Sequence, residues 1–540
     1  MERVGCGVVQ AVAGAMKDLL FPLLVVLVPA LAAAQQWTVY GGDLASTRFS
    51  PLDQINASNV NRLVVKWMFH TGVPGVFEAT PLFEDGVLYF TGPSGYAWAL
   101  DARTGRSLWQ YERAIPAKIG LCCGPVNRGF ALAGNRLFLV TIDAHVEALD
   151  KKTGQLLWDK VLADYKQGYS ATAAPLVVKD KVIVGMAGAE FANRGFVDAY
   201  SFTGERLWRL WTIPAPGEPG SETWKDGGDA WKRGGGSTWV TGSYDADLNL
   251  LYWGTGNPGP DLNRGVRPGD NLYSNSLLAI DPDTGKLKWH FQFTPHDTHD
   301  WDGVNEPVLA DIEVSGARRK ALLHADRNGF FYALDRANGT FIYGFPYIEQ
   351  TWAKGLDASG RPIPIPGLDP TKEGTVVCPG LGGGKNWNPM AYNPQTHLVY
   401  VPSFESCEKF SVDELLEPRP FLMWMGSVHE AAGATPAWSA LRAFDANTGK
   451  RIWEFKATTA GRDAALATAG DLVFSGDAEG YFTALHARTG KVLWRLPTGI
   501  LGGEPGRGIA APAVTYLLDG KQQVAVVAGS SMFAFQLIER

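Results

Sequence analysis

Short runs of alternating hydrophobic and polar residues follow one another along most of the chain, separated by glycine-containing turns. Leu137-Phe138-Leu139-Val140 is one apolar run, and it leads to a second strand that ends in Ala148-Leu149-Asp150. Runs of this length, bounded by turn residues, are typical of β-strands rather than helices. The pattern therefore predicts an all-β protein built from many short strands.

A repeated pattern connects these strands. It reads Ala, an apolar residue, Asp, two variable residues, Thr-Gly, three variable residues and Trp, and the glycine allows a tight turn with positive φ. Full copies occupy residues 99–109, 148–158, 279–289 and 443–453. Variant copies occupy 199–208, one residue shorter, 484–494, with His486 in place of Asp, and 333–343, which ends in tyrosine; a degenerate copy ends at Trp67.

Eight copies, spaced by roughly 40–50 residues, predict an eight-bladed β-propeller with tryptophan docking between neighbouring sheets, because one four-stranded sheet cannot bury both of its faces alone. We expect residues 35–540 to form this single domain. Tandem β-sandwich domains are the alternative, but they would not repeat a Thr-Gly turn and a Trp at this period. Two insertions exceed the period, at 214–236 and 362–388, and long loops on a rigid scaffold are where sites tend to lie.

The N-terminus has the composition of a secretory signal peptide. Arg3 and Lys17 precede an apolar run over 19–31, and Ala32-Ala33-Ala34 offers a cleavage point. We therefore expect residues 1–34 to be a signal peptide and the mature protein to be periplasmic. An uncleaved anchor is the alternative, and no later segment is long and apolar enough to span a bilayer.

Charge and cysteine content narrow the range of partners. The net charge is −6 with lysines and arginines scattered, so no basic patch for nucleic acid or anionic lipid is present, and partners should be small molecules or another protein. Cys6 lies in the signal peptide, and the even number that remains suits disulfides in an exported chain. Cys378 and Cys407 flank a long loop and are expected to pair. No Cys-x-x-Cys-His occurs, which excludes covalent haem on this chain.

The repeat with its tryptophan ends resembles the docking motif of the type I methanol and ethanol dehydrogenases that depend on pyrroloquinoline quinone (PQQ), and the similarity begins at about Trp37. Cys122-Cys123, followed by Asn127-Arg128, matches a motif of that family. The resemblance implies a vicinal disulfide over one face of the quinone and Arg128 on a PQQ carboxylate. Two free or separately paired thiols are the alternative. The same propeller also serves as a scaffold in outer-membrane assembly lipoproteins, so the fold alone does not decide the function.

Further fragments match cofactor positions of that family. The stretch from Gly235 to Trp239 resembles its glycine-rich segment, which ends in a tryptophan that stacks on the planar PQQ rings. Short polar residues at strand starts are usually only turn-formers, and this is the alternative for Glu78, Thr141 and the Asn386-Trp387 pair. The resemblance implies further PQQ contacts from Glu78, Thr141, Gly188, Ala189, Thr238, Asn386 and Trp387.

Three fragments match metal and catalytic positions. They are a Gly-Ala-Glu segment that ends at Glu190, a Gly-x-Gly-Asn-Pro turn that contains Asn257, and a loop that ends at Asp300. The resemblance implies that Glu190 and Asn257 bind a metal ion and that Asp300 is the base, which accepts the alcohol proton while hydride passes to metal-activated PQQ. Arg327 matches the family arginine that hydrogen-bonds the quinone oxygens. Each acidic residue alone would be a solvated loop charge, but their joint presence in this order favours a site.

Asp300-Trp301-Asp302 bears on the identity of the metal. Calcium enzymes of this family carry a small residue two positions after the catalytic aspartate, whereas the lanthanide-dependent branch carries a second aspartate there. Residues two apart on an extended segment point the same way, so both carboxylates can reach one ion. With Glu190 they present three negative charges, which suits a trivalent hard cation. We expect a lanthanide(III) ion, with Ca²⁺ as the alternative; a mere turn-capping role is the alternative for Asp302.

The resemblance thus implies periplasmic oxidation of a small primary alcohol to the aldehyde, with electrons passed to a separate carrier, a soluble cytochrome c. A non-catalytic propeller scaffold of the outer-membrane assembly type is one alternative, and a PQQ dehydrogenase for sugars or polymeric alcohols is another. The sequence leaves open which alcohol is oxidised and whether the chain forms a homodimer.

Overall fold

The computed structural model describes residues 36–415, 417–432, 436–461, 464–499 and 508–538. The predicted signal peptide, residues 1–34, lies outside them. Within the described residues there is no α-helix, and the all-β class is confirmed. The helices there are short 3-10 turns: η1 (Val60–Arg62), η2 (Pro93–Gly95), η3 (Tyr165–Gln167), η4 (Ala189–Phe191), η5 (Ser221–Thr223), η6 (Ala230–Arg233) and η7 (Arg264–Val266).

Most strands belong to four-stranded antiparallel sheets whose members follow one another along the chain. The first three sheets are β3 (Leu82–Glu84), β4 (Val87–Thr91), β5 (Tyr96–Asp101) and β6 (Ser107–Glu112); β7 (Ala131–Ala133), β8 (Arg136–Val140), β9 (His145–Asp150) and β10 (Leu156–Val161); and β11 (Leu176–Val178), β12 (Lys181–Gly185), β13 (Phe196–Ser201) and β14 (Arg206–Trp211).

The next three sheets are β15 (Ser243–Asp245), β16 (Leu250–Gly254), β17 (Ser276–Ile280) and β18 (Leu287–Gln292); β19 (Val308–Val314), β20 (Ala317–Ala325), β21 (Phe330–Asp335) and β22 (Phe341–Pro346); and β26 (Ala391–Asn393), β27 (Leu398–Glu405), β30 (Trp438–Asp445) and β31 (Arg451–Lys456).

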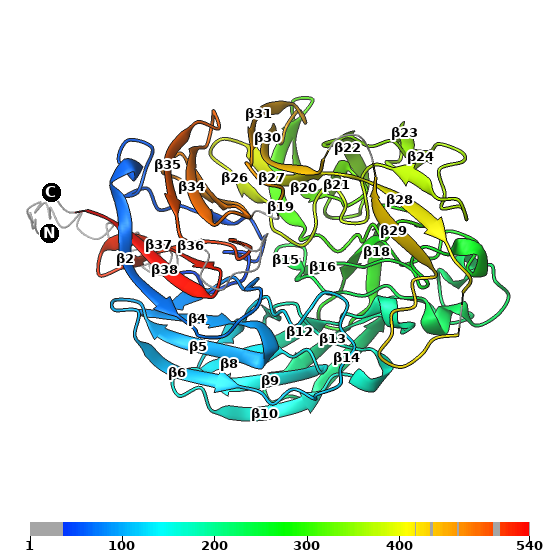
Figure 1. Cartoon of the computed structure of the whole chain (residues 1–540), viewed down its shortest axis with the longest axis horizontal. Helices are drawn as coiled ribbons and strands as arrows, with labels where there is room; N and C mark the ends of the chain where they lie inside the picture. Colours follow the sequence, from blue (N-terminus) through cyan, green and yellow to red (C-terminus); the bar gives the residue numbers. More distant parts are fainter. Residues whose placement is uncertain (1–35, 416, 433–435, 462–463, 500–507, 539–540) are drawn as a thin grey trace, which may run out of the picture.

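Two further sheets combine strands from both ends of the chain, as Figure 1 shows. β1 (Phe49–Ser50) pairs in parallel with β32 (Leu466–Thr468), beside β33 (Leu472–Gly476), β34 (Tyr481–His486) and β35 (Val492–Pro497). β2 (Leu63–His70) pairs with β38 (Ser531–Leu537), beside β37 (Lys521–Ala528) and β36 (Val514–Leu518). These pairings join the N-terminal strands to the C-terminal sheets.

Strand register explains why the sequence repeat contains alanine and tryptophan. In the sheet of β3–β6, Ala99 lies directly opposite Trp109, and the register shifts after Ala99. Ala148 faces Trp158 and Ala443 faces Trp453 in the same way. A small side chain opposite the indole leaves room for it within the pair.

Each tryptophan of the repeat reaches the next sheet. Trp109 Nε1 donates to the Lys151 carbonyl at 3.0 Å, and a Cβ added to Gly154, in the turn of that next sheet, would lie 2.7 Å from the indole. Gly154 has φ 72°, a conformation that favours glycine, so the Thr-Gly turn is fixed both by its backbone and by the ring packed on it. Trp494, at the last copy, donates to the Leu63 carbonyl on β2 at 3.0 Å, so the last copy of the repeat contacts an N-terminal strand.

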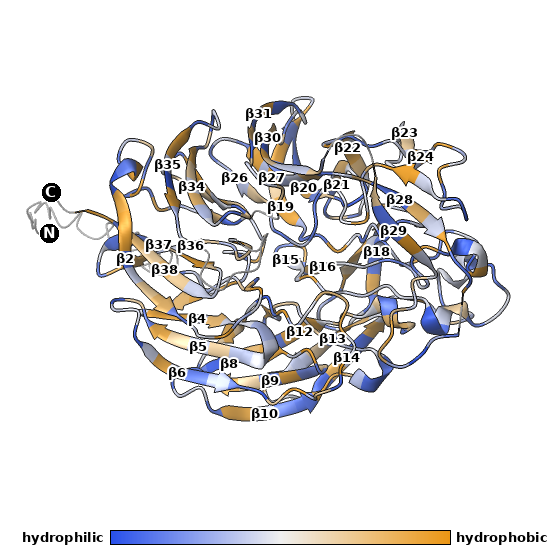
Figure 2. Cartoon of the chain, viewed as in Figure 1, coloured by the Kyte–Doolittle hydropathy of each residue, from blue (hydrophilic) through white to orange (hydrophobic). Residues whose placement is uncertain are grey.

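Burial differs between the strands of one sheet. β4 and β5 are almost entirely buried, whereas β6 and β10 alternate or are exposed. Figure 2 shows the same contrast, with hydrophobic residues along β4 and β5 and hydrophilic segments on β10. Apolar surface is therefore buried between neighbouring sheets, and the outer strands face solvent.

The two predicted insertions are the least regular parts of the structure. The first contains only the short turns η5 and η6. The second contributes β24 (Pro362–Pro364) to a small sheet with β23 (Ala353–Leu356), and β25 (Thr375–Val377) to another with β28 (Cys407–Val412) and β29 (Ser427–Ala432), strands that lie outside the insertion. Cys378 and Cys407 form the expected disulfide and tie the second insertion to β28. Nowhere in the described residues is there a helix long and apolar enough to cross a membrane.

Candidate active site

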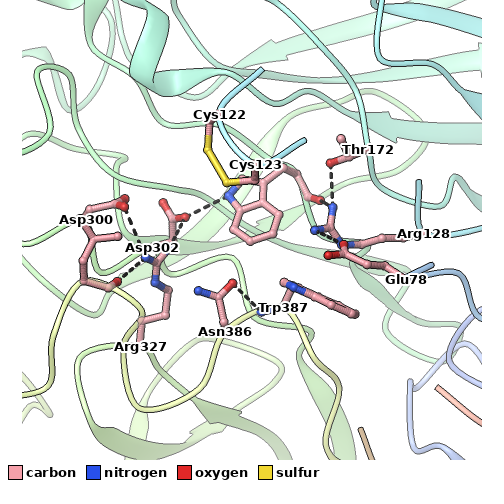
Figure 3. The surroundings of a disulfide bond; sticks show 12 residues. Glu78, Cys122, Cys123, Arg128, Thr172, Asp300, Asp302, Arg327, Asn386 and Trp387 are labelled. Atoms are coloured by element: carbon pink, nitrogen blue, oxygen red, sulfur yellow. Dashed lines mark hydrogen bonds and ion pairs between the residues drawn. A yellow bond between two sulfur atoms is a disulfide. The ribbon is translucent and has the colours of Figure 1, made fainter. Parts of the chain in front are cut away.

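A cavity of about 280 Å³ lies where loops from several sheets meet. Most of the residues selected from the sequence line it, although they come from positions some 300 residues apart. Figure 3 shows this region, with the Cys122–Cys123 disulfide near the cluster of Asp300, Asp302 and Arg327. The predicted residues that line the cavity are Glu78, Cys122, Cys123, Arg128, Gly188, Glu190, Trp239, Asp300, Asp302, Arg327, Asn386 and Trp387.

Arg128 organises one side of the cavity. Its guanidinium forms an ion pair with Glu78 at 2.7 Å and donates to Thr172 Oγ1 at 2.7 Å. The same group lies over the rings of Trp239 and Trp387, at 4.8 and 5.0 Å from their centroids. Cation–π contact of this kind holds a guanidinium in one orientation. Arg128 is therefore a fixed positive charge beside two flat aromatic surfaces.

Cys122 and Cys123 form the expected vicinal disulfide. Both lie in the loop between β6 and β7 and line the same cavity as Trp239. A disulfide offers apolar, polarisable sulfur atoms, and an indole offers a flat π surface. The cavity thus has the lining that a planar ligand requires.

Arg327 organises the other side. It lies between β20 and β21 and donates to Asp302 Oδ2 at 2.6 Å and to Asp300 Oδ2 at 3.3 Å, as the dashed lines in Figure 3 indicate. A third hydrogen bond goes to the Leu381 carbonyl. Asp300 has φ 58°, a left-handed conformation that aspartate tolerates better than most side chains. Arg327 therefore bridges the two carboxylates of the Asp-Trp-Asp segment.

Asp302 joins three loops that are distant in sequence. Its Oδ1 accepts from the backbone N–H of Asn257 at 2.6 Å, and its Oδ2 accepts from Trp239 Nε1 at 2.9 Å as well as from Arg327. Asp302 is 2% exposed. A turn-capping role for Asp302 would not need partners from three separate loops.

The carboxylates of the cavity are held in an environment that disfavours their charge. Burial raises the pKa of Asp300 well above its ordinary value, and the Arg327 guanidinium opposes that rise. Burial also raises the pKa of Glu190 to about 7, with the charge of Asp302 acting in the same direction. Desolvation of an anion has this sign, and a nearby cation relieves it. The cavity would therefore bind a cation or a proton more strongly than the same carboxylates would in water.

Four predicted residues lie outside the cavity lining. Thr141 Oγ1 donates to Asp143, Thr238 Oγ1 donates to the Phe196 carbonyl, and Ala189 is a buried residue in η4. Asn257 is fully buried behind Asp302, and its Oδ1 accepts no hydrogen bond from a described residue.

The unsatisfied polar atoms test whether PQQ and a metal ion fit. Arg128 Nε, Arg327 Nε and Trp387 Nε1 are buried donors without a hydrogen-bond acceptor among the described residues, while Asp300 Oδ1 and Asn257 Oδ1 are buried acceptors without a donor. Buried polar groups are normally satisfied, so these atoms call for a ligand. PQQ is a flat quinone that carries carboxylates and can accept the unpaired N–H groups, and the oxygens suit a hard cation. The residues present fit both groups.

The carboxylates do not yet form a finished metal cage. Among the residues that the structure describes, no three His, Cys, Asp or Glu side chains are grouped as metal ligands. Arg327 bridges Asp300 and Asp302 instead. Binding a metal would require these carboxylates to exchange contact with the guanidinium for contact with the ion.

Several cavity residues had no signal in the sequence. Thr172 follows from no repeat or motif, yet it bonds Arg128. Met423, Met425 and His429 reach the cavity from the segment that leads into and forms β29. They lie between β28 and β30, in a part of the chain that carries no copy of the repeat, so residue periodicity gives no information about their spatial position.

On a scaffold of four-stranded antiparallel sheets, the cavity is thus lined by two arginines, a vicinal disulfide and several buried carboxylates. The family model described as "Glucose/ethanol/alcohol dehydrogenase, beta-propeller domain" matches residues 37–364. The chain is 42% identical over 529 residues to the quinoprotein alcohol dehydrogenase PedH of Pseudomonas putida, covering 92% of this chain and 86% of the relative. The chain therefore belongs to the family of PQQ-dependent quinoprotein alcohol dehydrogenases.

Two further comparisons agree with that assignment. The lanthanide-dependent methanol dehydrogenase of Methylacidiphilum fumariolicum is 39% identical and is matched over 92% of this chain and 84% of its own length. The crystal structure of the quinohemoprotein alcohol dehydrogenase from Comamonas testosteroni superposes with a TM-score of 0.89 at 36% identity, covering 95% of this chain and 82% of that one.

A second family model, described as outer membrane protein assembly factor BamB, matches only residues 438–534. None of the candidate catalytic or ligand-binding residues lies in that range. The match to that family model therefore includes none of the predicted site residues.

Proposed function

We propose that this enzyme oxidises a small primary alcohol to the aldehyde, with PQQ and one metal ion bound in the cavity and Asp300 as the base. The observation that carries the proposal is the state of Asp300. It is buried in the cavity, one of its oxygens is held by Arg327, and the other, Oδ1, accepts no hydrogen bond from a described residue. A carboxylate with a raised pKa and one free oxygen can take the hydroxyl proton of an alcohol.

The residues that would hold PQQ follow from the lining. The vicinal disulfide and Trp239 would face the flat rings, Arg128 would bind a PQQ carboxylate, and Asn386 and Trp387 would contact its edge. When bound, PQQ supplies a two-electron acceptor for the alcohol. Arg327 would then orient both Asp300 and the reacting oxygen atoms of the site.

The metal ligands would be Glu190, Asn257, Asp300 and Asp302. Three of them are carboxylates, so the set carries three negative charges, and a lanthanide(III) ion matches that charge better than Ca²⁺ does. The 39% identity to a lanthanide-dependent methanol dehydrogenase supports the same choice. Calcium is the second candidate, since the same oxygen ligands also suit a divalent hard cation.

The arrangement of the sheets supports a wider proposal on architecture. We propose that residues 35–540 form one domain of eight blades, in which each repeat tryptophan docks on the turn of the next blade. The contact of Trp494 with β2 supports closure of the ring. We further propose that the protein is exported after removal of residues 1–34. We also propose that its electrons pass to a soluble cytochrome c, because the chain carries no haem-attachment motif of its own.

The proposal is tested by dye-linked oxidation of a panel of alcohols, with PQQ and either La³⁺ or Ca²⁺ added to the purified protein. We expect turnover of primary alcohols by the wild type and a loss of about a thousandfold in Asp300→Asn, which keeps the shape but cannot accept the proton. Asp159→Asn, on β10 and outside the cavity lining, is the matched control and should keep the wild-type rate. An unchanged rate in Asp300→Asn would contradict the role of this residue. Turnover of sugars or polymeric alcohols alone would favour the alternative substrate class.

A further inference from the structure

Asp261 is a buried carboxylate in the same loop as the predicted metal ligand Asn257, and no motif in the sequence distinguishes it. It lies between β16 and η7, four residues after Asn257, and it is 0% exposed. Neither of its carboxylate oxygens accepts a hydrogen bond from any described residue. An ionised group in that position is costly unless a partner compensates its charge.

The position of Asp261 is fixed by its backbone. Arg267 Nη2 donates to the Asp261 carbonyl at 2.9 Å, and the next residue, Leu262, donates its N–H to the Met425 carbonyl at 3.1 Å. Met425 itself lines the cavity. The backbone around Asp261 is therefore anchored against the wall of the site.

The nearest buried arginine does not pair with the Asp261 carboxylate. Arg267 directs its donors to the carbonyls of Pro260, Asp261 and Asp297 and to Asn271 Oδ1. The hydrogen bonds of Arg267 thus hold the surrounding loops together and do not reach the Asp261 carboxylate. The charge of Arg267 lowers the pKa of Asp261 but does not offset the effect of burial, and because no hydrogen bond from a described residue reaches the carboxylate it remains available for another cation.

The electrostatic neighbours of Asp261 are the predicted metal ligands. Burial raises its pKa well above the ordinary value, and the charges of Glu190 and Asp302 raise it further. The charge of Asp261 in turn raises the pKa of Asp300. Asp261 therefore interacts electrostatically with carboxylates that are proposed to hold the ion.

The buried carboxylates around the predicted metal ligands outnumber the arginine that pairs with them. Glu190, Asp261, Asp300 and Asp302 together carry four negative charges when ionised, and Arg327 is the one guanidinium that pairs with members of this set among the described residues. Three negative charges then lack a cation. A single trivalent ion balances them, whereas a divalent ion leaves one uncompensated.

We propose that Asp261 supplies a fourth carboxylate charge to the metal site and thereby favours a trivalent over a divalent ion. This inference rests on the proposed function, because it assumes that an ion binds at Glu190, Asn257, Asp300 and Asp302. It adds a specificity-determining residue to that set. The charge effect scales with the charge of the ion, so it acts more strongly on a trivalent ion than on Ca²⁺.

The test compares wild type with Asp261→Asn, which removes the charge at nearly constant volume. Metal-stripped full-length protein with PQQ is titrated with Tb³⁺ against a competing chelator, with terbium luminescence as the readout, and separately with Ca²⁺. We expect the Tb³⁺ affinity to fall by about tenfold or more and the Ca²⁺ affinity to fall less, so that the preference for Tb³⁺ narrows. Asp198→Asn, an equally buried aspartate that pairs with Arg209 outside the cavity lining, should leave both affinities unchanged.

Thermal unfolding supplies a second readout that does not depend on activity. Removing an unpaired buried charge should raise the melting temperature of the metal-free protein, whereas the Tb³⁺-loaded variant should melt below the loaded wild type. The variant would thus melt above wild type without the ion and below wild type with it. This reversal is expected of a carboxylate that destabilises the metal-free protein and stabilises the metal-bound protein.

The outcomes separate the two proposals. Equal Tb³⁺ affinity in wild type and Asp261→Asn, or an equal loss for both ions, overturns the role of Asp261 alone. A different result would be an unchanged Tb³⁺ affinity in Asp261→Asn together with a higher KM for the cationic alcohol 2-aminoethanol but not for uncharged alcohols. In that case the carboxylate binds a cationic substrate group and the inference is wrong. A wild type that neither binds Tb³⁺ nor oxidises alcohols would overturn the proposed function itself.

Discussion

Two acidic clusters in this protein are each built around one arginine, and they differ in how completely they are satisfied. Arg113 bonds Asp143, Glu147 and Asp159 between β6 and the sheet of β7–β10. Arg327 bonds Asp300 and Asp302 in the cavity.

In the Arg113 cluster every carboxylate oxygen has a partner. Arg113 contacts both oxygens of Asp143, Tyr111 donates to both oxygens of Glu147, and His145 contacts the oxygen of Asp159 that Arg113 leaves free. Such a network is complete without a ligand, which is the property of a structural element.

The Arg327 cluster leaves one carboxylate oxygen over, and the buried Asp261, in the loop that contains the predicted ligand Asn257, leaves two. Asp300 Oδ1 and both oxygens of Asp261 have no hydrogen-bond donor among the described residues. Acidic residues around an arginine therefore do not by themselves indicate a site. Buried oxygens without a donor, beside a cavity, do.

A substitution of Asp302 tests whether the carboxylates of the Arg327 cluster select the metal ion. Asp302→Ala should lose the lanthanide-supported rate by about a hundredfold while Ca²⁺ still supports turnover, because the lost carboxylate contributes most to binding a trivalent ion. Rates of alcohol-dependent dye reduction with La³⁺ and with Ca²⁺ measure the effect. Equal losses with both ions would show that Asp302 serves the structure of the site and not the choice of ion.

At the satisfied cluster the expected effect is on stability alone. Glu147 is fully buried, and Glu147→Gln leaves Arg113 without one of its charged partners, so the free energy of unfolding should fall by about 3 kcal/mol. Denaturant unfolding measures the loss, and the alcohol oxidation rate of the folded variant should match wild type. A selective loss of metal affinity in this variant would remove the distinction between the clusters.

Lys385, a buried cation next to the cavity residue Asn386, gives a test based on pH. It is buried beside Asn386, and desolvation lowers its pKa from 10.5 to about 7, although the charge of Glu306 opposes the shift. Between those two values the unfolded chain binds the proton and the folded protein does not, so the free energy of unfolding should rise with pH from about 7 to about 10. Lys385→Met should be more stable at pH 7 and should lack this part of the rise. Equal pH slopes in wild type and variant, measured by denaturant unfolding, would show that Lys385 is already neutralised by a partner.

The framework of the fold could be predicted from the sequence because its repeat has a local physical cause. The Thr-Gly turn, the alanine and the tryptophan occupy fixed positions in one antiparallel pair of strands. The contact between Ala99 and Trp109, ten residues apart, can therefore be predicted from the local sequence. The predicted site residues came from motifs that match a family, and the structure brings most of them to one cavity.

The remaining site residues could not be predicted because their roles depend on contacts between distant loops. Asp261 resembles any loop aspartate in sequence, and only its burial and its unpaired oxygens set it apart. Thr141 shows the converse, since a matching position placed it at the cofactor, while in the structure its hydroxyl bonds Asp143 of the Arg113 cluster. Whether Thr141 also contacts PQQ stays a prediction.

We propose above that the unsatisfied carboxylates of the cavity hold a metal ion that PQQ chemistry requires. The most direct test removes metal from the purified protein with a chelator, adds PQQ, and measures alcohol-dependent dye reduction with La³⁺, Ce³⁺ or Ca²⁺. We expect La³⁺ and Ce³⁺ to restore the rate and Ca²⁺ to restore it weakly. Restoration by Ca²⁺ but not by La³⁺ or Ce³⁺ would contradict the choice of ion, and full activity without any added metal would contradict the claim itself.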